Sequence, residues 1–391
     1  MVFKARNSVA PNAPAHRKLV LVICAFVLSG IFTAGLWPFH APKNEVSWLG
    51  NGDGLLFGEH GSVVTAGAFN ARQSEEDAAC SLEIWAQPAR TDSSGTILAF
   101  YQPDARVVPF ALRQSLGDLV LQRKDKDIDK SARSAKIYVD DVFSQHQPVF
   151  VSITSDKNGT RIYVDGLLIK ASPNFRLSRQ DLTGRLVMGN SPITTNSWSG
   201  QLKGLAIYER DLTSGQVPQH YKSWLEHRQL DLAKSESSVA LYLFKEDQGS
   251  IVHNEMDATT DFLIPERFFA LHPQFLEAPW DEFRPDWSYW KDVAINILGF
   301  IPLGFSFYAY FSASSKIKRA TALTIGFGFA VSLAIEILQA FLPTRDSGMT
   351  DIMTNTLGTA IGAMLYRYSS SSLILEDHNH STRANELARS S

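Results

Sequence analysis

Residues 19–36 read LVLVICAFVLSGIFTAGL, an apolar run without a single charged residue. At about 1.5 Å of rise per residue, this run is just long enough to cross the hydrocarbon core of a bilayer as one helix. It is preceded by Lys4, Arg6, Arg17 and Lys18 and by no acidic residue. Because basic flanks stay in the cytoplasm, the run predicts a membrane-spanning helix with a cytoplasmic N-terminal tail.

A cleavable signal peptide is the alternative for this run, because Thr33-Ala34-Gly35 resembles a small-residue cleavage site. The length of the run and the flank Trp37-Pro38-Phe39, which is typical of a membrane interface, favour a helix that is retained. We therefore expect a basic tail over 1–18 and a transmembrane helix over 19–37.

Three further segments near the C-terminus are candidates for membrane helices. They are expected at about 292–311, 320–342 and 350–368. The last is the weakest, because it contains Asp351, Asn355 and several threonines. Its second half is apolar, however, and Gly358 and Gly362 form a GxxxG motif that permits close helix approach. About four membrane helices are therefore predicted.

Basic residues also fix the predicted orientation of these helices. The short loop between the second and third helices contains Lys316, Lys318 and Arg319. With four crossings, this loop and both termini lie in the cytoplasm, and the region 38–290 lies outside. We expect a multi-pass protein of the bacterial inner (cytoplasmic) membrane. Its serine-rich tail, 369–391, is expected to be disordered.

Length, charge and cysteine content narrow the remaining possibilities. The 391 residues suffice for two folding units, and the net charge of −3 gives no reason to expect nucleic-acid binding. Cys24 lies in the first membrane run, whereas Cys80 precedes a predicted strand, so we expect no disulfide between them. The absence of a CxxC motif excludes a thiolate zinc site.

The region between the first and second membrane segments has the pattern of short β-strands. These are SLEIWAQP (81–88), VFVSIT (149–154), IYVDGLLI (162–169), LVMGN (186–190) and WSGQLKGLAIY (198–208). The first alternates apolar and polar residues, which indicates a strand with one buried face. Asp165-Gly166 joins two apolar runs, a strong hairpin signal. Strands at this spacing predict an all-β sandwich.

In this order the strand motifs resemble the laminin-G-like, concanavalin A-like jelly-roll domain, over about 45–245. The resemblance implies two stacked antiparallel sheets. Many members of the family bind carbohydrate or protein, so it implies a binding module for an extracytoplasmic glycan or protein. Some members hold calcium, which makes Ca²⁺ the one cofactor that the resemblance allows.

Four observations bear on what such a domain could bind. The strand pattern around Trp85 predicts a core position, whereas Trp198 follows the polar loop 191–197 and is the candidate for a glycan contact. Packing in the core or at the rim is the alternative for Trp198. Asp165 is interpreted as a turn former rather than a calcium ligand. No ExDxxE-type pair of carboxylates, which a glycosidase would need, occurs on one strand.

The segment 246–290 is rich in proline and aromatic residues. The aromatic residues are Phe262, Phe268, Phe269, Phe275, Trp280, Phe283, Trp287, Tyr289 and Trp290. Such density next to a membrane entry predicts a juxtamembrane segment in the interfacial belt. A helix along the surface, broken by Pro273, Pro279 and Pro285, would fit this pattern.

Polar side chains in the membrane segments come in pairs that share a helix face. The pairs are Asp292 with Asn296, Glu336 with Gln339, and Asp351 with Asn355. The predicted topology puts all six at the outer end of the helices, beside Arg345 in the outer loop. Glu336 would lie about 9 Å inside the bilayer, where its carboxylate must be protonated or find a partner such as Arg345. The sequence therefore predicts a polar ligand pocket, or else polar groups that only join helices.

These residues carry a second resemblance, to the VanZ-like family of bacterial membrane proteins. It rests on Asp292-x3-Asn296-x3-Phe300-x-Pro302-Leu303-Gly304-Phe305, Glu336-x2-Gln339-x-Phe341-x3-Arg345 and Asp351-x3-Asn355-x2-Gly358-x3-Gly362. The VanZ-like region would cover 291–368. The usual first helix of the family would correspond to 19–36, with the sandwich inserted after it. The resemblance implies a bacterial cell-envelope role more directly than any reaction.

Three functions follow from these predictions. The favoured one is a non-catalytic membrane protein whose sandwich recognises a glycan or protein and whose pocket binds a membrane lipid or lipid-linked saccharide. The first alternative is an intramembrane enzyme in which Glu336 acts as acid or base and Arg345 binds phosphate, although no nucleophile–histidine or metal pattern supports it. The second is a small transporter that uses Glu336.

Overall fold

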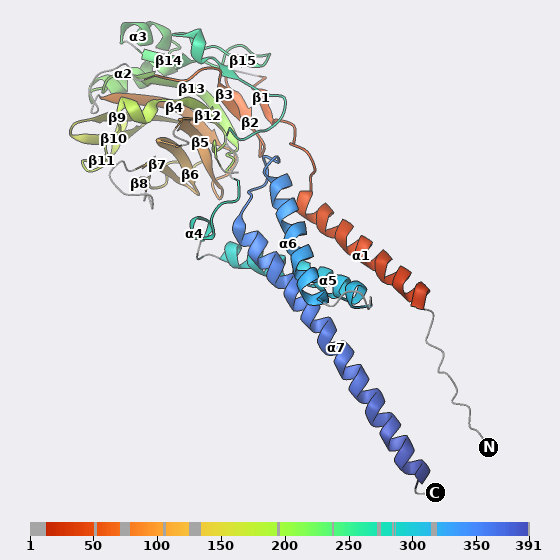
Figure 1. Ribbon diagram of the computed structural model, residues 1–391. Helices are drawn as coiled ribbons and strands as arrows, with labels where there is room; N and C mark the ends of the chain where they lie inside the picture. Colours follow the sequence, from red (N-terminus) through yellow and green to blue (C-terminus); the bar gives the residue numbers. More distant parts are fainter. Residues whose placement is uncertain are drawn as a thin grey trace. The chain divides into compact units, whose positions relative to one another are not determined.

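The chain forms two compact units in the computed structural model. One comprises residues 1–40 and 274–391 and is helical, and the other comprises residues 41–273 and is a β-sandwich (Figure 1). The structure describes residues 13–50, 53–70, 79–104, 107–124, 134–193, 196–236, 238–271, 275–283, 285, 287–313 and 319–389. Four of the basic residues behind the predicted orientation, Lys4, Arg6, Lys316 and Lys318, lie outside this description.

Two antiparallel sheets of eight strands each build the sandwich. The first has the order β1-β2-β13-β4-β9-β10-β11, with β14 also paired to β13. Its strands are β1 (Val46–Trp48), β2 (Leu55–Phe57), β4 (Cys80–Pro88), β9 (Val149–Asp156), β10 (Gly159–Val164), β11 (Leu167–Ser172), β13 (Gly200–Tyr208) and β14 (Ser238–Tyr242). The predicted strands of this sheet are confirmed.

The second sheet has the order β15-β16-β3-β12-β5-β6-β7-β8. Its strands are β3 (Val63–Thr65), β5 (Ser94–Tyr101), β6 (Phe110–Ser115), β7 (Asp118–Lys124), β8 (Ser134–Val139), β12 (Arg185–Met188), β15 (Ile251–Val252) and β16 (Phe262–Leu263). Apolar side chains from both sheets form one core, among them Phe100, Ile153 and Leu205, none more than 1% exposed. Burial of this shared core holds the two sheets face to face.

The predicted hairpin turn is present between β10 and β11. Val164 pairs with Leu167, which leaves Asp165 and Gly166 as a two-residue loop with φ values of 50° and 81°. Both residues lie in the left-handed region, as a turn of this type requires. The Asp165 carboxylate accepts a hydrogen bond from the Phe150 backbone N–H, so its structural role as a turn former is confirmed.

Strand β4 differs from the sequence prediction, because both of its faces are buried. Helices α2 (Gln216–Leu225) and α3 (Gln229–Ser235) cover the outer face of the first sheet and form a second apolar cluster with it. Val217, Tyr221 and Trp224 supply the helical spacing of the buried face of α2. A strand that alternates apolar and polar residues is therefore covered on its polar side as well.

The sandwich also extends further along the chain than predicted. Strands β15 and β16 pair with each other, and β16 pairs with β3, so residues up to 263 belong to the second sheet. Phe262 and Phe268 are fully buried in the sandwich unit. The prediction of a juxtamembrane segment from 246 was therefore wrong over this stretch, because its aromatic rings fill the core of the sandwich. Short 3₁₀ turns cover Arg179–Leu182 and Ala258–Thr260.

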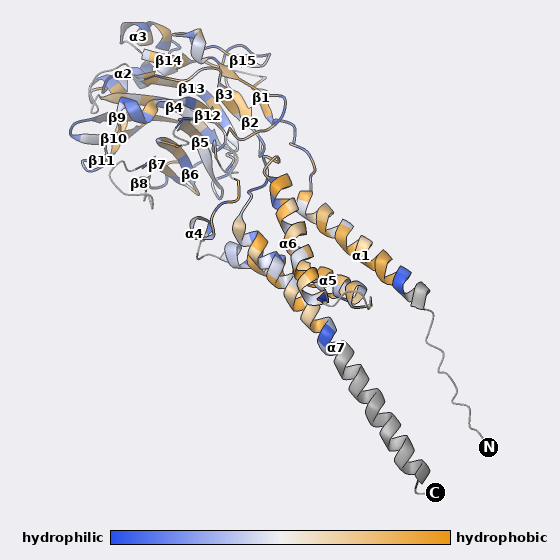
Figure 2. Ribbon diagram, in the orientation of Figure 1, coloured by the Kyte–Doolittle hydropathy of each residue, from blue (hydrophilic) through white to orange (hydrophobic). Residues whose placement is uncertain are grey.

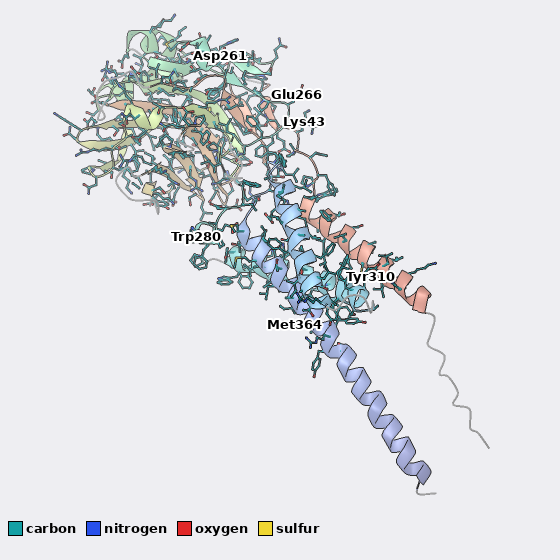
Figure 3. All side chains as sticks on the ribbon, viewed as in Figure 1. Lys43, Asp261, Glu266, Trp280, Tyr310 and Met364 are labelled. Atoms are coloured by element: carbon teal, nitrogen blue, oxygen red, sulfur yellow. The ribbon has the colours of Figure 1, made fainter. Side chains whose placement is uncertain are left out.

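The helical unit contains five helices among the described residues. They are α1 (Ala13–Leu36), α4 (Pro279–Glu282), α5 (Trp287–Ser312), α6 (Ala320–Gln339) and α7 (Met349–Arg389). Within the described residues, Arg17–Leu36, α5 and α6 are long and apolar enough to cross a membrane. Figure 2 shows that hydrophobic residues predominate along α1. Large apolar side chains remain exposed on these helices and on α4 and α7, such as Trp280 and Met364, labelled in Figure 3.

Small residues bring α5, α6 and α7 close together. A Cβ on Gly358 would lie 2.2 Å from the Ile297 carbonyl oxygen, and one on Gly362 would lie 2.1 Å from that of Ile301. From the other side, a Cβ on Gly304 would lie 2.0 Å from the Thr359 carbonyl oxygen. The predicted GxxxG motif therefore lies directly on the backbone of α5.

Helix α7 is longer than the predicted fourth segment. It continues to Arg389, so the backbone of the tail expected to be disordered is helical as far as that residue. The four serines at 369–372 lower the helix propensity only modestly, and neither proline nor glycine follows Gly362 to end the helix.

Candidate functional site

All seven sequence-predicted pocket residues line one cavity of about 490 Å³ in the helical unit. They are Asp292, Asn296, Glu336, Gln339, Arg345, Asp351 and Asn355. Helices α5, α6 and α7 and the loop after α6 supply them, and Ile31, Ala34 and Gly35 of α1 close the wall. The spacing of the polar pairs thus brought these side chains together as expected, and their binding role stays a prediction.

Two hydrogen bonds join the helices across the cavity. The Asn296 side-chain amide donates to Asp351 Oδ1 at 2.8 Å, which links α5 to α7. The Asn355 amide donates to Ser332 Oγ at 2.9 Å, which links α7 to α6. Part of the polar character of the site therefore serves to join helices, as the alternative interpretation expected.

Two carboxylates hold the beginning of α7. Glu336 Oε2 accepts the Gly348 backbone N–H at 2.8 Å, and Glu282 Oε2 accepts that of Thr350 at 2.9 Å. The first N–H groups of a helix lack partners within the helix and carry a partial positive charge, so carboxylates are favoured there. Glu336 is only 1% exposed, so its carboxylate is enclosed by protein.

Arg345 contacts α1 instead of Glu336. Its guanidinium donates to the carbonyl oxygen of Trp37 at 2.9 Å and 3.2 Å, and to that of Ala34 at 3.5 Å. Gln339 adds a hydrogen bond from its amide nitrogen to the Gly35 carbonyl oxygen at 2.8 Å. A cation at the C-terminal end of a helix is favourable, and these contacts tie α1 to the other helices. Sequence reasoning missed the carbonyl groups of α1 as partners.

Two buried amide oxygens in the cavity have no hydrogen-bond partner. They are Gln339 Oε1 and Asn355 Oδ1, on side chains that are 8% and 5% exposed. An unpartnered buried acceptor costs about 1–3 kcal/mol, which a bound donor can recover. The cavity therefore offers acceptors to a ligand.

A smaller pocket of about 230 Å³ adjoins the cavity and is acidic. Five carboxyl groups line it, from Glu277, Glu282, Asp292, Asp346 and Asp351. Asp292 and Asp351 line both spaces. Among the described residues, no group of three or more His, Cys, Asp or Glu side chains is arranged to hold a metal ion.

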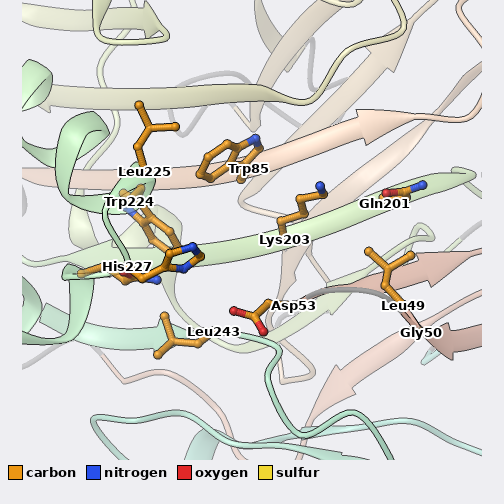
Figure 4. A pocket seen from close by; sticks show the side chains of 11 residues that line it. Leu49, Gly50, Asp53, Trp85, Gln201, Lys203, Trp224, Leu225, His227 and Leu243 are labelled. Carbon is orange, nitrogen blue, oxygen red and sulfur yellow. The ribbon is translucent and has the colours of Figure 1, made fainter.

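The sandwich contains a second candidate site, a pocket of about 530 Å³ on the outer face of the first sheet (Figure 4). The indole rings of Trp85 and Trp224 line it beside the polar side chains of Lys203, Asp53 and His227. Trp85 was predicted to lie in the core, but it is only partly buried and packs against the apolar cluster between α2 and the sheet.

Two further features shape this pocket. The Trp224 ring packs against β13 at Gly204, which has no side chain; a Cβ there would be 2.2 Å from the ring. His227, just after α2, has a φ of 55°, a conformation that costs a side-chain-bearing residue about 1 kcal/mol. Gln229 is 5% exposed, and its Oε1 has no hydrogen-bond partner.

Trp198, the sequence candidate for a glycan contact, is buried and cannot serve that role. It is 2% exposed, and its indole N–H donates to Gln114 Oε1 at 2.8 Å. The ring packs over Gly200, where a Cβ would lie 2.4 Å from it. The polar loop that precedes Trp198 predicted exposure, but the missing side chain at position 200 leaves room for the ring in the core.

Beneath α2 lies a buried polar cluster that sequence reasoning missed. Glu83 accepts hydrogen bonds from Tyr208 Oη and Trp224 Nε1, both at 3.1 Å. Its other oxygen lies 3.0 Å from Nδ1 of His220, whose Nε2 lies 3.2 Å from Glu236. Burial by itself lowers the pKa of His220, but Glu83 and Glu236 outweigh it and raise that pKa above its ordinary value.

One sequence signal could have revealed that helix α2 covers the outer face of the first sheet. Thr213 and Gln216 exchange side-chain to backbone hydrogen bonds, a capping-box pattern three residues apart just before the apolar positions of α2. A helix predicted there would have had an apolar face, and that face would have had to pack against a sheet.

Two family models match the chain. The VanZ/LLP1 model matches residues 237–374, and the model of the concanavalin A-like lectin/glucanases superfamily matches residues 58–218. The first match begins just before β14, and the second lies within the sandwich. The chain therefore carries a VanZ-like region and a concanavalin A-like sandwich, and it is a membrane-associated cell-envelope protein with a binding domain.

No curated protein sequence matches this chain. Among solved structures, the receptor-binding domain of botulinum neurotoxin D is similar at 15% identity over 46% of each chain, with a TM-score of 0.35. That of botulinum neurotoxin type G has 17% identity over 47% of this chain and 51% of the other, with a TM-score of 0.30. The binding domain of Paraclostridial Mosquitocidal Protein 1 has 15% identity over 47% of each chain, with a TM-score of 0.32. This chain thus spans about half the length of those chains.

Proposed function

We propose that this is a multi-pass protein of the bacterial cytoplasmic membrane whose helical cavity binds the polar head group of a membrane amphiphile. In this proposal both termini lie in the cytoplasm, and the sandwich recognises a glycan outside. The helical cavity is the better supported of the two sites.

One observation carries the proposal for the cavity. Side chains from separate helices meet in one space, and two buried amide oxygens, Gln339 Oε1 and Asn355 Oδ1, remain unpartnered in it. Groups that served only to join helices would be expected to satisfy one another, because an unpartnered buried polar atom is costly. Apolar side chains such as Ile295 and Phe300 line the same cavity, as an amphiphile requires.

Lipid retention tests this proposal. The full chain is purified in detergent, and the lipids that stay bound are identified by native mass spectrometry. We expect wild type to retain lipid and the Glu336→Ala/Asp351→Ala variant to lose it. Asp104→Asn, at an exposed position in the sandwich, is the control. Equal retention by wild type and the double variant would count against a head-group site.

The pocket on the sandwich supports a glycan as its ligand. Trp85 offers partly exposed apolar ring surface, with the buried Trp224 ring lining the same pocket, while Lys203 and Asp53 offer hydrogen-bonding groups beside it. Its volume falls in the range of small-molecule sites, roughly 300–1,000 Å³. A sugar ring combines an apolar face with hydroxyl groups at its edge, so it matches both kinds of surface.

A glycan array probed with the full chain in nanodiscs tests this second site. We expect Trp85→Ala and His227→Gly to weaken binding to any glycan that wild type recognises. Leu116→Gly is a matched control, because Leu116 is exposed, also has a φ of 55°, and does not line the pocket. Glycan binding that survives both pocket substitutions would place recognition elsewhere on the domain.

A further inference from the structure

Carboxyl groups outnumber cationic side chains among the described residues that line the helical cavity and its adjoining pocket. Six carboxyl groups line the cavity and the pocket that adjoins it, from Glu277, Glu282, Glu336, Asp292, Asp346 and Asp351. The only cationic side chain among the described residues that line the two spaces is Arg345. An excess of acidic groups inside a low-dielectric region creates a negative potential that attracts cations.

Arg345 is not arranged to bind an anion. Its Nε and one of its terminal nitrogens donate to the carbonyl oxygens at the end of α1. A phosphate group needs the planar fork of a guanidinium for bidentate binding, and here much of that fork faces the backbone of α1. The guanidinium therefore positions α1 at the cavity wall, and the free groups of the cavity are acceptors.

We propose that the cavity holds the primary ammonium group of a membrane lipid, an inference that rests on the proposed head-group function and specifies its ligand. An ammonium group has three N–H donors and no acceptor. Gln339 Oε1 and Asn355 Oδ1 are the two unpartnered acceptors, and the carboxylates of Glu336 and Asp351 supply the compensating charge. Charge and hydrogen bonding thus favour the same ligand group.

The apolar part of the wall indicates that the ammonium belongs to a lipid rather than to a soluble amine. Ile31 of α1, Ile295 and Phe300 of α5 and Ile335 of α6 line the cavity together with the polar groups. On the outer surfaces of α5 and α6, large apolar side chains such as Leu298 and Phe329 remain exposed. Acyl chains would pack against these helices while the head group enters the cavity.

Nanodiscs with lipids that differ only in the head group provide the test. Phosphatidylethanolamine carries a primary ammonium group, phosphatidylcholine has the same charges without N–H donors, and phosphatidylglycerol lacks the cation. The full chain is released from discs that contain all three with matched acyl chains, and native mass spectrometry measures which lipid is retained. We expect phosphatidylethanolamine to be enriched at least about tenfold over the other two, the effect of one strong hydrogen bond.

Two substitutions connect the preference to the cavity. Glu336→Gln removes one charge but keeps an oxygen that can accept the Gly348 N–H, and Gln339→Leu removes one unpartnered acceptor. Both should reduce the enrichment by about tenfold, while Asp104→Asn should leave it unchanged. Thermal unfolding of each variant shows whether it is folded, and either substitution in a folded protein suffices for the test.

The outcomes separate this inference from the proposal on which it rests. Equal retention of the three lipids, lost in Glu336→Gln, would overturn the ammonium preference and leave the head-group site intact. Retention that neither substitution changes would overturn both. Excess soluble ethanolamine should fail to displace the lipid, and displacement by it would overturn the assignment to a lipid.

Discussion

The two buried polar clusters of this protein differ in how completely their hydrogen bonds are satisfied. In the sandwich, both oxygens of Glu83 have partners, and His220 lies between two carboxylates. In the helical cavity, the oxygens of Gln339 and Asn355 have none. Both clusters are buried and both contain carboxylates, yet only the second has buried acceptor oxygens without a partner.

This difference separates a structural role from a binding role. A saturated network, one whose buried acceptor oxygens all have partners, fixes α2 on the sheet and has no acceptor left for a ligand. In an unsaturated network, the buried polar atoms without partners destabilise the free protein, and a ligand that donates hydrogen bonds to them removes that destabilisation. A buried carboxylate therefore indicates a structural or a binding role only when the hydrogen-bond partners of its cluster are also known.

The largest effect is expected from Glu83→Ala in the saturated cluster. It removes the acceptor of Tyr208 and Trp224 and leaves His220 with one carboxylate. Removing one partner of a buried ion pair costs about 3–5 kcal/mol. Urea unfolding of the full chain in detergent, followed by tryptophan fluorescence, should show this loss in the sandwich transition. A loss below about 1 kcal/mol would contradict a structural role.

A smaller loss is expected from Gly358→Ala between α5 and α7. The added methyl group would lie 2.2 Å from the Ile297 carbonyl oxygen, so the helices must separate. Overpacking of this kind typically costs about 1–3 kcal/mol. The thermal midpoint of the helical unit should fall, whereas Gly326→Ala, where a Cβ meets nothing within 4 Å, should leave it unchanged.

The pH dependence of the sandwich sharpens the comparison further. Because the pKa of His220 is raised above its ordinary value of 6.5, protonated His220 stabilises the fold fully below that pH. This contribution is lost as the pH rises through the folded-state pKa. The urea midpoint should therefore decrease as the pH is raised from about 6 to about 9, roughly the range above that ordinary value. In His220→Gln the urea midpoint should depend less on pH. A flat wild-type profile would show that His220 folds uncharged.

The smallest stability effect is expected from Gln339→Met in the unsaturated cluster. The substitution removes a hydrogen bond to Gly35 but also removes a buried unpartnered oxygen. These two contributions oppose each other, so the free energy of unfolding should change by no more than about 1 kcal/mol and the thermal midpoint should shift little. Lipid retention should nevertheless fall. A large destabilisation would place Gln339 with Glu83 among the structural groups.

Much of the fold follows from local patterns. The apolar run at 19–36, the Asp165-Gly166 turn and the GxxxG motif each predicted an element or contact that is present. Even the convergence of the seven polar residues came from spacing and orientation. The spacing of apolar residues indicates on which face of a helix or strand a residue lies, and this spacing can be seen within a few neighbouring residues.

The sequence by itself thus determined the long apolar helices, some of the strands and which side chains of these elements share a face. Only the tertiary structure decided what covers each face. It buried Trp198 over Gly200, placed α2 over Glu83, added β15 and β16 to the sandwich and turned Arg345 toward α1. Each of these outcomes depends on a partner far away in the chain, because burial and hydrogen bonding are settled by packing, whereas periodicity is local.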